Sequence, residues 1–304
     1  MKQLTIFTPT FNRAYTLPIL YDSLISQTEK SFIWLIVDDG SADNTEEIVK
    51  HWITENKLEI KYVKQQNMGM VAAHNTAHLN IFTELNVCID SDDFMPLDGV
   101  NSVLDYWNSL ENKENLMGIV GLDTYKSGEV IGDSFPANVE RCTFSEIIHK
   151  YKIKGDKKYV LRTDLIKSVL PYPYIEGEKF PAPSYLYLIL ESKFKFALLN
   201  KPLCIVEYLP DGNSMNKVKQ YLKSPNAFAL YRIARMKYSY DFKDKVKNCL
   251  HYISSKILGD RKNMIKDSPE KLLTIVLFPF GFLLSRYIKT KKGGAVNIKL
   301  NNKK

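Results

Sequence analysis

The chain has 304 residues, of which 45% are hydrophobic and 25% are charged, with a net charge of +8. This composition excludes a largely disordered chain, and the length suffices for one large domain with an additional segment. The four cysteines lie far apart, with no CxxC and no Cys/His cluster, which argues against a structural zinc site or a disulfide framework.

The first hundred residues alternate between short apolar segments and segments with helical spacing. Strands are expected at residues 4–8, 32–37, 59–64 and 86–90, and helices at residues 16–27, 44–56 and 70–82. Apolar strands that alternate with helices are typical of a parallel, doubly wound sheet in an α/β fold. Right-handed crossovers in such a sheet bring the carboxyl ends of the strands to one edge.

Three polar motifs follow these predicted strands. They are Thr8-Pro9-Thr10-Phe11-Asn12-Arg13, Asp38-Asp39-Gly40-Ser41 and Asp90-Ser91-Asp92-Asp93. Because carboxylates gathered at one strand end repel one another, the third motif indicates a divalent cation bound together with a diphosphate. A solvated acidic turn that opens the next helix, with Asp98 as its N-cap, is the alternative interpretation.

The segment from residue 117 to residue 215 shows a looser order of elements. Strands are expected at residues 118–122, 159–162 and 199–208, and helices at residues 164–170 and 184–192. Between the two helices lies a proline-rich loop that contains Glu176-Gly177-Glu178.

The last part of the chain is basic, and helices are expected at residues 221–238 and 243–258. Residues 216–304 hold 21 Lys and Arg against 5 Asp and Glu, a net charge of +16, whereas residues 1–215 carry −8. The charge-free run 272–284 is broken by Pro279 and Gly281 and is shorter than the ~20 residues that span a bilayer. We expect an interfacial or re-entrant element on anionic lipid headgroups, with a helix packed on the preceding domain as the alternative.

Together with Asn67-Met68-Gly69 and Asn75, the motifs resemble those of the family 2 glycosyltransferases, over roughly residues 3–215. The resemblance implies a GT-A fold, which has a Rossmann-like, mostly parallel sheet with flanking helices. The implied domains are a catalytic domain at 1–215, with a nucleotide-binding half (1–98) and an acceptor-binding half (99–215), and a helical, basic, membrane-associating region at 216–304.

The function that this resemblance implies is an inverting, metal-dependent transfer of a hexose or N-acetylhexosamine from a UDP-sugar. The acceptor would be a hydroxyl of a lipid-linked or growing bacterial surface glycan. A nucleotidyltransferase acting on a sugar phosphate is the alternative, although the Gly-rich phosphate loop expected after its first strand is missing.

The resemblance also implies roles for individual residues. Nucleotide binding falls to Pro9, Thr10, Phe11, Arg13, Asp39, Asn67, Gly69, Asp90 and Ser91. In this group Asp39 would accept a hydrogen bond from N3–H of uracil, because a carboxylate is purely an acceptor. Asp38 would support the loop. Asp92, with Asp90, would bind Mn²⁺ or Mg²⁺ through the diphosphate, and Asp93 would cap the following helix.

An inverting transfer also needs a carboxylate base. Members of the family usually carry an acidic pair a few residues after a Glu-Gly turn, and this chain departs from that pattern because no acidic pair precedes the helix expected at 184–192. Glu178 is the first candidate for the base and Glu176 the second. The alternative is that both glutamates are merely surface charges of the loop.

Three further residues are candidates for donor or lid contacts. They are His74, with a packing histidine as the alternative, Asp156, with a plain turn residue as the alternative, and Asp211, in the turn where a lid would close over the diphosphate.

We expect the protein to be cytoplasmic and peripheral, on the inner face of the cell membrane, because the first apolar run is too short for a signal peptide. Residues 268–304 would form the attachment. The expected partners are the UDP-sugar and a lipid-linked or oligosaccharide acceptor, with a homo-oligomer left open. A nucleic-acid partner is not expected, because no nucleic-acid module is recognisable.

Overall fold

The computed structural model describes residues 2–173, 175–178, 183–207 and 217–290. The chain divides into two compact units, residues 1–210 and 211–304.

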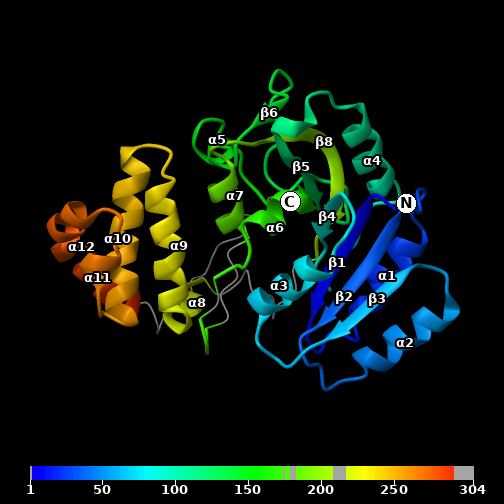
Figure 1. Cartoon of the computed structure of the whole chain (residues 1–304), viewed down its shortest axis with the longest axis horizontal. Coiled ribbons are helices and arrows are strands. Elements are labelled where there is room, and N and C mark those ends of the chain that lie inside the picture. The colour runs from blue at the N-terminus through cyan, green and yellow to red at the C-terminus, as the bar shows by residue number, and fades with distance from the viewer. Residues whose placement is uncertain (1, 174, 179–182, 208–216, 291–304) are drawn as a thin grey trace, which may run out of the picture. The chain divides into compact units, whose positions relative to one another are not determined.

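An eight-stranded sheet forms the centre of the first unit (Figure 1). Its strands in chain order are β1 (Leu4–Thr10), β2 (Phe32–Asp38), β3 (Ile60–Lys64), β4 (Leu85–Cys88), β5 (Leu116–Thr124), β6 (Arg141–Cys142), β7 (Lys157–Arg162) and β8 (Lys195–Ile205). The order across the sheet is β3-β2-β1-β4-β7-β5-β8-β6. The first four strands pair in parallel, as does β5 with β8. The expected α/β fold with a mostly parallel sheet is therefore confirmed.

Two strands outside the first hundred residues, β7 and β6, run opposite to the other strands of the sheet. β7 lies between β4 and β5 and runs antiparallel to both. β6 is a short antiparallel strand at the edge beside β8. The antiparallel direction of β7 brings its amino end, rather than its carboxyl end, to the edge where β4 ends.

Helices cover both faces of the sheet. The helices of the first unit are α1 (Leu17–Ile25), α2 (Thr45–Glu55), α3 (Met70–Asn80), α4 (Gly99–Ser109), the 3-10 turn η1 (Lys113–Asn115), α5 (Phe144–His149), α6 (Thr163–Ser168) and α7 (Ser184–Leu190). Ile6 and Trp34 pack in one cluster with residues of α1, α2 and α4. Phe7 and Leu35, one residue further along each strand, pack against α3 on the other face. This alternation produces the doubly wound arrangement.

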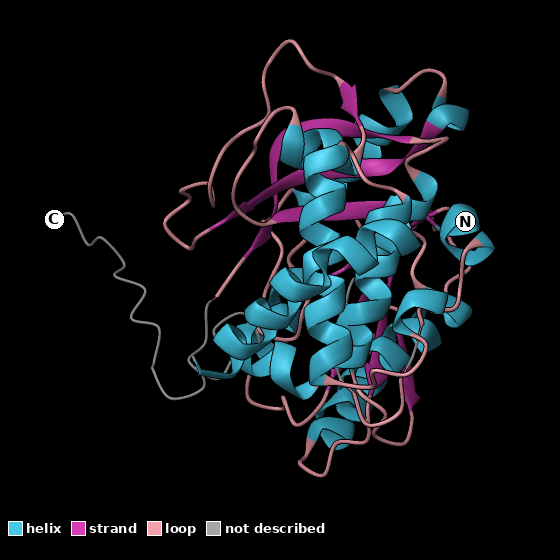
Figure 2. Cartoon of the chain, turned by 90° about the vertical axis from the view of Figure 1, so that its left-hand side faces the viewer, coloured by secondary structure: helices cyan, strands magenta, loops and turns pink. Residues whose placement is uncertain are grey.

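The described part of the second unit consists of helices (Figure 1, Figure 2). They are α8 (Lys217–Lys223), α9 (Pro225–Lys237), α10 (Phe242–Leu258), α11 (Met264–Asp267) and α12 (Lys271–Thr290). The single helix expected at 221–238 is wrong, because Pro225 cannot continue a helix but readily begins one.

The expected break at Pro279 and Gly281 is also wrong. α12 continues through both positions as one helix of 20 residues. It is the one helix of the described chain that is long and apolar enough to cross a membrane, judged by length and composition. Gly281 marks a close approach, since a Cβ there would lie 2.5 Å from Cγ2 of Ile253 on α10. The glycine therefore serves helix packing and does not interrupt the helix.

Candidate active site

The three motifs that follow β1, β2 and β4 leave the sheet at the same edge. Backbone hydrogen bonds continue the parallel pairing beyond the strands, from Asp39 N to Thr10 O at 2.8 Å and from Ile89 N to Phe7 O at 3.1 Å. Because the pairing is in register up to these bonds, the segments 9–13, 38–41 and 90–93 begin side by side. This is the edge where open α/β sheets bind their ligands.

Asp39 is a buried carboxylate that is held by three donors. Its Oδ1 accepts hydrogen bonds from Gln65 Nε2 at 2.8 Å and Met68 N at 2.9 Å, and its Oδ2 accepts one from Gly69 N at 2.7 Å. Gly69 has a φ of +89°, a conformation that side chains other than glycine rarely adopt. A carboxylate has about four acceptor positions, so this arrangement leaves about one for a further donor.

Asp38 supports the same loop, as expected from the sequence. Its Oδ1 accepts a hydrogen bond from Ser41 N at 2.7 Å, and its Oδ2 accepts one from the Tyr62 hydroxyl at 2.5 Å. Ser41 in turn accepts a hydrogen bond from Asn12 N at 2.9 Å. The loops after β1 and β2 are thus linked to each other.

The end of β1 and the loop after it carry a buried, unpaired hydroxyl and an exposed ring. The Phe11 side chain is 45% exposed, whereas Pro9 and Thr10 are buried at the strand end. The buried Oγ1 of Thr10 has no hydrogen-bond partner within the described chain. Arg13 contacts the hydroxyl and the ring of Tyr15.

The acidic motif after β4 divides into accessible and buried carboxylates. Asp90 is exposed and Asp92 is half-buried, while Ser91 and Asp93 are buried. The expectation that Asp93 caps the next helix is wrong, because Asp98 occupies the N-cap of α4.

Asp93 lies in a buried contact instead. Its Oδ2 lies 3.8 Å from Lys158 Nζ, and its Oδ1 accepts a hydrogen bond from Glu207 N at 3.3 Å. Burial raises the pKa of Asp93 to about 7, with the charges of Asp90 and Asp92 adding to the rise and Lys158 opposing it.

Lys158 and Asp123 are site residues that sequence reasoning missed. Lys158 reaches this edge because β7 runs antiparallel, and its side chain is only 12% exposed. Burial raises the pKa of Asp123 to about 6, again against the charge of Lys158. Burial acts to lower the pKa of Lys158, but its neighbours, including Asp123 and Asp93, hold it well above its usual value. A charged lysine thus lies behind the acidic motif.

The accessible carboxylates fit a cation that arrives with a nucleotide. No group of three His, Cys, Asp or Glu side chains within the described residues could hold a metal by itself. Asp90 and Asp92 offer at most two carboxylate ligands. Mg²⁺-like ions typically bind through one or two carboxylates and complete their shell with phosphate oxygens and water.

The candidate bases lie in the loop before α7. Gly177 has a φ of +78° and forms a turn that leaves Glu176 exposed and Glu178 half-buried. The start of this loop is fixed to α3 by Asn75, whose side chain exchanges hydrogen bonds with the backbone of Tyr172 at 3.1 and 2.8 Å. The role of Glu178 or Glu176 as a base stays a prediction.

The three candidates for donor or lid contacts differ in position. His74 is buried, lies edge-on to Phe7 at 5.3 Å between ring centroids, and has a pKa lowered by burial. This environment matches a packing histidine. Asp156 is exposed just before β7, and Asp211 lies outside the described residues.

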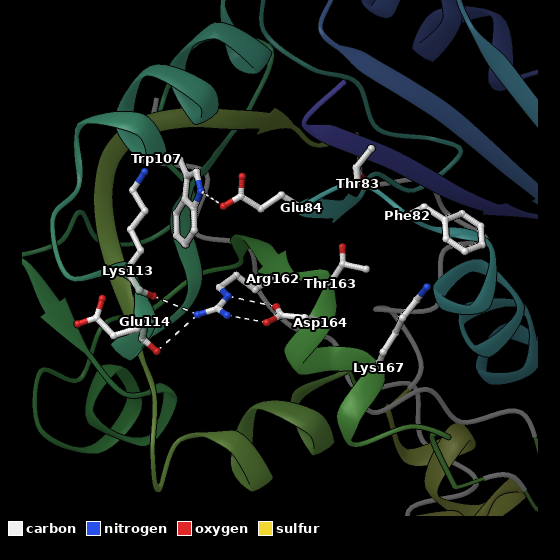
Figure 3. Close-up of a pocket in the computed structure, with 10 residues that line it drawn as sticks. All are labelled: Phe82, Thr83, Glu84, Trp107, Lys113, Glu114, Arg162, Thr163, Asp164 and Lys167. Carbon is white, nitrogen blue, oxygen red and sulfur yellow. Dashed lines mark hydrogen bonds and ion pairs between the residues drawn. The ribbon is translucent and has the colours of Figure 1, made fainter. Parts of the chain in front are cut away.

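A separate pocket of about 510 Å³ lies at the opposite edge of the sheet, beside the amino end of β4 (Figure 3). Four of its polar side chains bind one another in two pairs. Trp107 Nε1 donates to Glu84 Oε1 at 2.8 Å, and the Arg162 guanidinium pairs with Asp164 at 2.6 Å. These internal bonds explain the charged lining, and the pocket is remote from the three motifs.

Comparisons with known proteins address the same region. A family model described as "Glycosyl transferase family 2" matches residues 5–130. Glycosyltransferase GlyA of Streptococcus pneumoniae serotype 4 is 35% identical over 101 residues, which are 33% of this chain and 14% of that protein. Chondroitin synthase of Escherichia coli is 24% identical over 275 residues, 84% of this chain and 37% of that protein. The chain therefore spans well under half the length of these relatives.

Solved structures share the fold. The structure of S. aureus TarS 1–349 in complex with UDP-GlcNAc has a TM-score of 0.61 at 20% identity, covering 95% of this chain and 88% of that one. The likeness extends over both units of the chain, and at this identity it concerns the fold alone.

Proposed function

The chain belongs to glycosyl transferase family 2 through residues 5–130 and has a GT-A fold, and on that premise we propose an inverting transfer from a UDP-sugar. The sugar would be a hexose or an N-acetylhexosamine. The acceptor would be a hydroxyl of a lipid-linked or growing surface glycan. The binding of UDP-GlcNAc by a protein of the same fold supports a UDP-linked donor.

The observation that carries this proposal is the environment of Asp39. Its carboxylate is buried, is oriented by three donors and has about one acceptor position left, beside the loop that presents Phe11. Uracil has a donor at N3 and a flat apolar face, so one carboxylate and one exposed ring suit it. The unpaired hydroxyl of Thr10 is a further polar group at the same strand end.

The transfer needs a base on the acceptor side. In the proposed step the acceptor oxygen attacks the anomeric carbon while the bond from that carbon to the diphosphate oxygen breaks. The acceptor proton passes to a carboxylate, for which Glu178 is our first candidate and Glu176 the second, and UDP leaves with the bonding electron pair. The hydrogen bonds between Asn75 and Tyr172 fix the start of the loop that carries both glutamates.

We further propose that Asp92, with Asp90, holds Mn²⁺ or Mg²⁺ when the nucleotide is bound. Such an ion would neutralise charge that develops on the leaving diphosphate. Lys158, behind the motif, lies 3.8 Å from Asp93, which is the buried one of the three carboxylates. Asp90 and Asp92 are then the two that stay accessible.

The proposed working place is a membrane surface. The basic segment 216–304, with its net charge of +16, suits an anionic surface, and α12 has the length and composition of a membrane-associating helix. A lipid-linked acceptor is presented at such a surface.

A donor screen tests the proposal. Nucleotide release would be measured with UDP-GlcNAc, UDP-glucose and GDP-mannose in the presence of Mn²⁺, using the full chain and the variant Asp92→Asn. We expect release from a UDP-sugar alone and a loss of at least about 100-fold in Asp92→Asn, whose fold should be unchanged. Release from GDP-mannose alone would contradict the donor assignment. Full activity of Asp92→Asn in titrated Mn²⁺ would contradict the assignment of Asp92.

A further inference from the structure

Helix α12 packs with its small, polar side inward. Its buried residues are Thr274, Gly281 and Ser285. The Thr274 hydroxyl lies 2.7 Å from Ser268 Oγ, and Gly281 lets the helix approach Ile253 of α10. The fully buried positions of the helix therefore hold small residues, whereas Leu273 and Leu277 pack against the cluster around Tyr252 and Ile253 and are only half-buried.

The outward side of α12 carries the large apolar residues. Leu272 is 76% exposed, Phe280 61% and Leu283 63%, and the exposed set also contains Ile275, Val276, Phe278, Phe282 and Tyr287. This distribution is the reverse of that of a water-exposed helix. A contiguous exposed apolar face of this kind indicates a partner that covers it.

Cations accompany this apolar face. Lys271, Arg286 and Lys289 are exposed on α12, and the helix contains no acidic residue. A second copy of this chain would bring the same cations together, so the charge disfavours a copy and favours an anionic surface.

A pocket of about 620 Å³ lies beside the same face of the helix. Its apolar lining includes Ile275 and Phe278 of α12 together with Ile265, and its cations are Arg261 and Lys266. Both cations are exposed, and neither forms an ion pair with any residue in the described part of the chain. The pocket thus combines an apolar wall with two available cations.

We propose that this pocket binds an anionic phospholipid of the membrane, with the phosphate between Arg261 and Lys266 and the upper acyl chain against Ile265 and Phe278. The exposed face of α12 lies in the surrounding bilayer interface. This inference rests on the membrane placement in the proposed function, which it deepens by naming the lipid chemistry and the residues that recognise it.

Vesicle flotation of the full chain tests the proposal. Vesicles of phosphatidylcholine alone are compared with vesicles in which about 30% of the lipid is the anionic phosphatidylglycerol. The pocket variant Arg261→Gln/Lys266→Gln is matched with Lys223→Gln/Lys237→Gln, which removes the same charge from exposed positions on α8 and α9. We expect the pocket variant to lose about 30-fold in affinity for the anionic vesicles, and the control clearly less.

The outcomes separate the inference from the proposed function. Equal losses in the two variants would overturn the lipid site and leave only diffuse charge attraction. Failure of the unaltered chain to float would contradict the membrane placement itself, whatever the donor screen shows. Nucleotide release by both variants should equal that of the unaltered chain on a soluble acceptor.

Soluble probes distinguish the source of the phosphate. Calorimetric titration with monomeric dihexanoyl phosphatidylglycerol should show binding that is lost in Arg261→Gln/Lys266→Gln, while inorganic phosphate should bind much more weakly. Equally tight binding of inorganic phosphate would overturn the lipid assignment. So would a change from dimer to monomer on Phe280→Ser/Leu283→Ser without loss of vesicle binding, because a second copy would then cover the helix.

Discussion

Removal of the cation at Lys158 is a direct perturbation of the candidate site. Lys158→Met keeps a straight side chain of similar length and deletes the charge that faces Asp93 and Asp123. The contact from Lys158 Nζ to Asp93 Oδ2 is 3.8 Å, and both side chains are almost fully buried. We therefore expect the two buried carboxyls to lose the positive charge that Lys158 supplies, although Asp93 keeps the hydrogen bond from Glu207 N.

The expected loss of stability follows from this distance and from the pKa values. At 3.8 Å and an effective dielectric constant of about 20, the attraction is about 4 kcal/mol, and deletion of one partner of a buried pair costs about 3–5 kcal/mol. The pKa values of Asp93 and Asp123 are raised to about 7 and about 6. Both carboxyls are ionised at pH 8.5 and protonated at pH 5, so the attraction is present above about pH 7 and is lost as the pH falls.

Urea unfolding measured by tryptophan fluorescence is the assay. All three tryptophans, at positions 34, 52 and 107, lie in the first unit, so the signal reports on the unit that contains the site. Lys158→Met should lower the free energy of unfolding by about 3–5 kcal/mol at pH 8.5 and by much less at pH 5. Lys195→Met, at an exposed position of β8, serves as the control. A loss below about 1 kcal/mol at pH 8.5, or an equal loss at both pH values, would refute the reasoning.

Two further substitutions test the transfer step and the packing of α12. Glu178→Gln should lower turnover by about 100-fold or more while UDP affinity is retained, and Glu176→Gln should be nearly silent; the opposite pattern in steady-state assays would identify Glu176 as the base. Gly281→Ala would place a Cβ 2.5 Å from Ile253 Cγ2, so the free energy that protects α10 amides from hydrogen exchange should fall by about 1–3 kcal/mol. Leu283→Ala, at an exposed position of the same helix, should change it by less than about 0.5 kcal/mol, and equal effects would argue against the close packing.

The first half of the fold was accessible from the sequence because its signals are local. Apolar runs of strand length alternate with segments of helical spacing, and each polar motif directly follows a strand. Once the strands are parallel, chain connectivity alone brings Asp39 and the acidic motif to one edge. The distance between motifs along the chain is then irrelevant.

The second half was less accessible because strand direction has no local signature. The run from Lys157 to Arg162 predicts a strand equally well in either direction, so nothing indicated that Lys158 would meet Asp93. The assignment of Asp93 as a helix cap failed for the same reason, since its partners come from β7 and from residues after β8.

The break expected in the last helix illustrates a different limit. Proline and glycine both disfavour the interior of a helix, but tertiary context can override such local preferences. Gly281 packs on Ile253, and this contact between α10 and α12 is set by tertiary structure, which a pattern within one segment does not contain.

Titration of the full chain with UDP and with CDP tests the central claim most directly. Uracil offers a donor at N3 to the Asp39 carboxylate, whereas cytosine offers an acceptor at the same position. The two ligands therefore differ at the base atom that would face Asp39. We predict that UDP binds at least about tenfold more tightly than CDP, and that Asp39→Asn abolishes most of this preference. Equal affinities for the two nucleotides, or an unchanged preference in Asp39→Asn, would contradict a uridine site at this edge of the sheet.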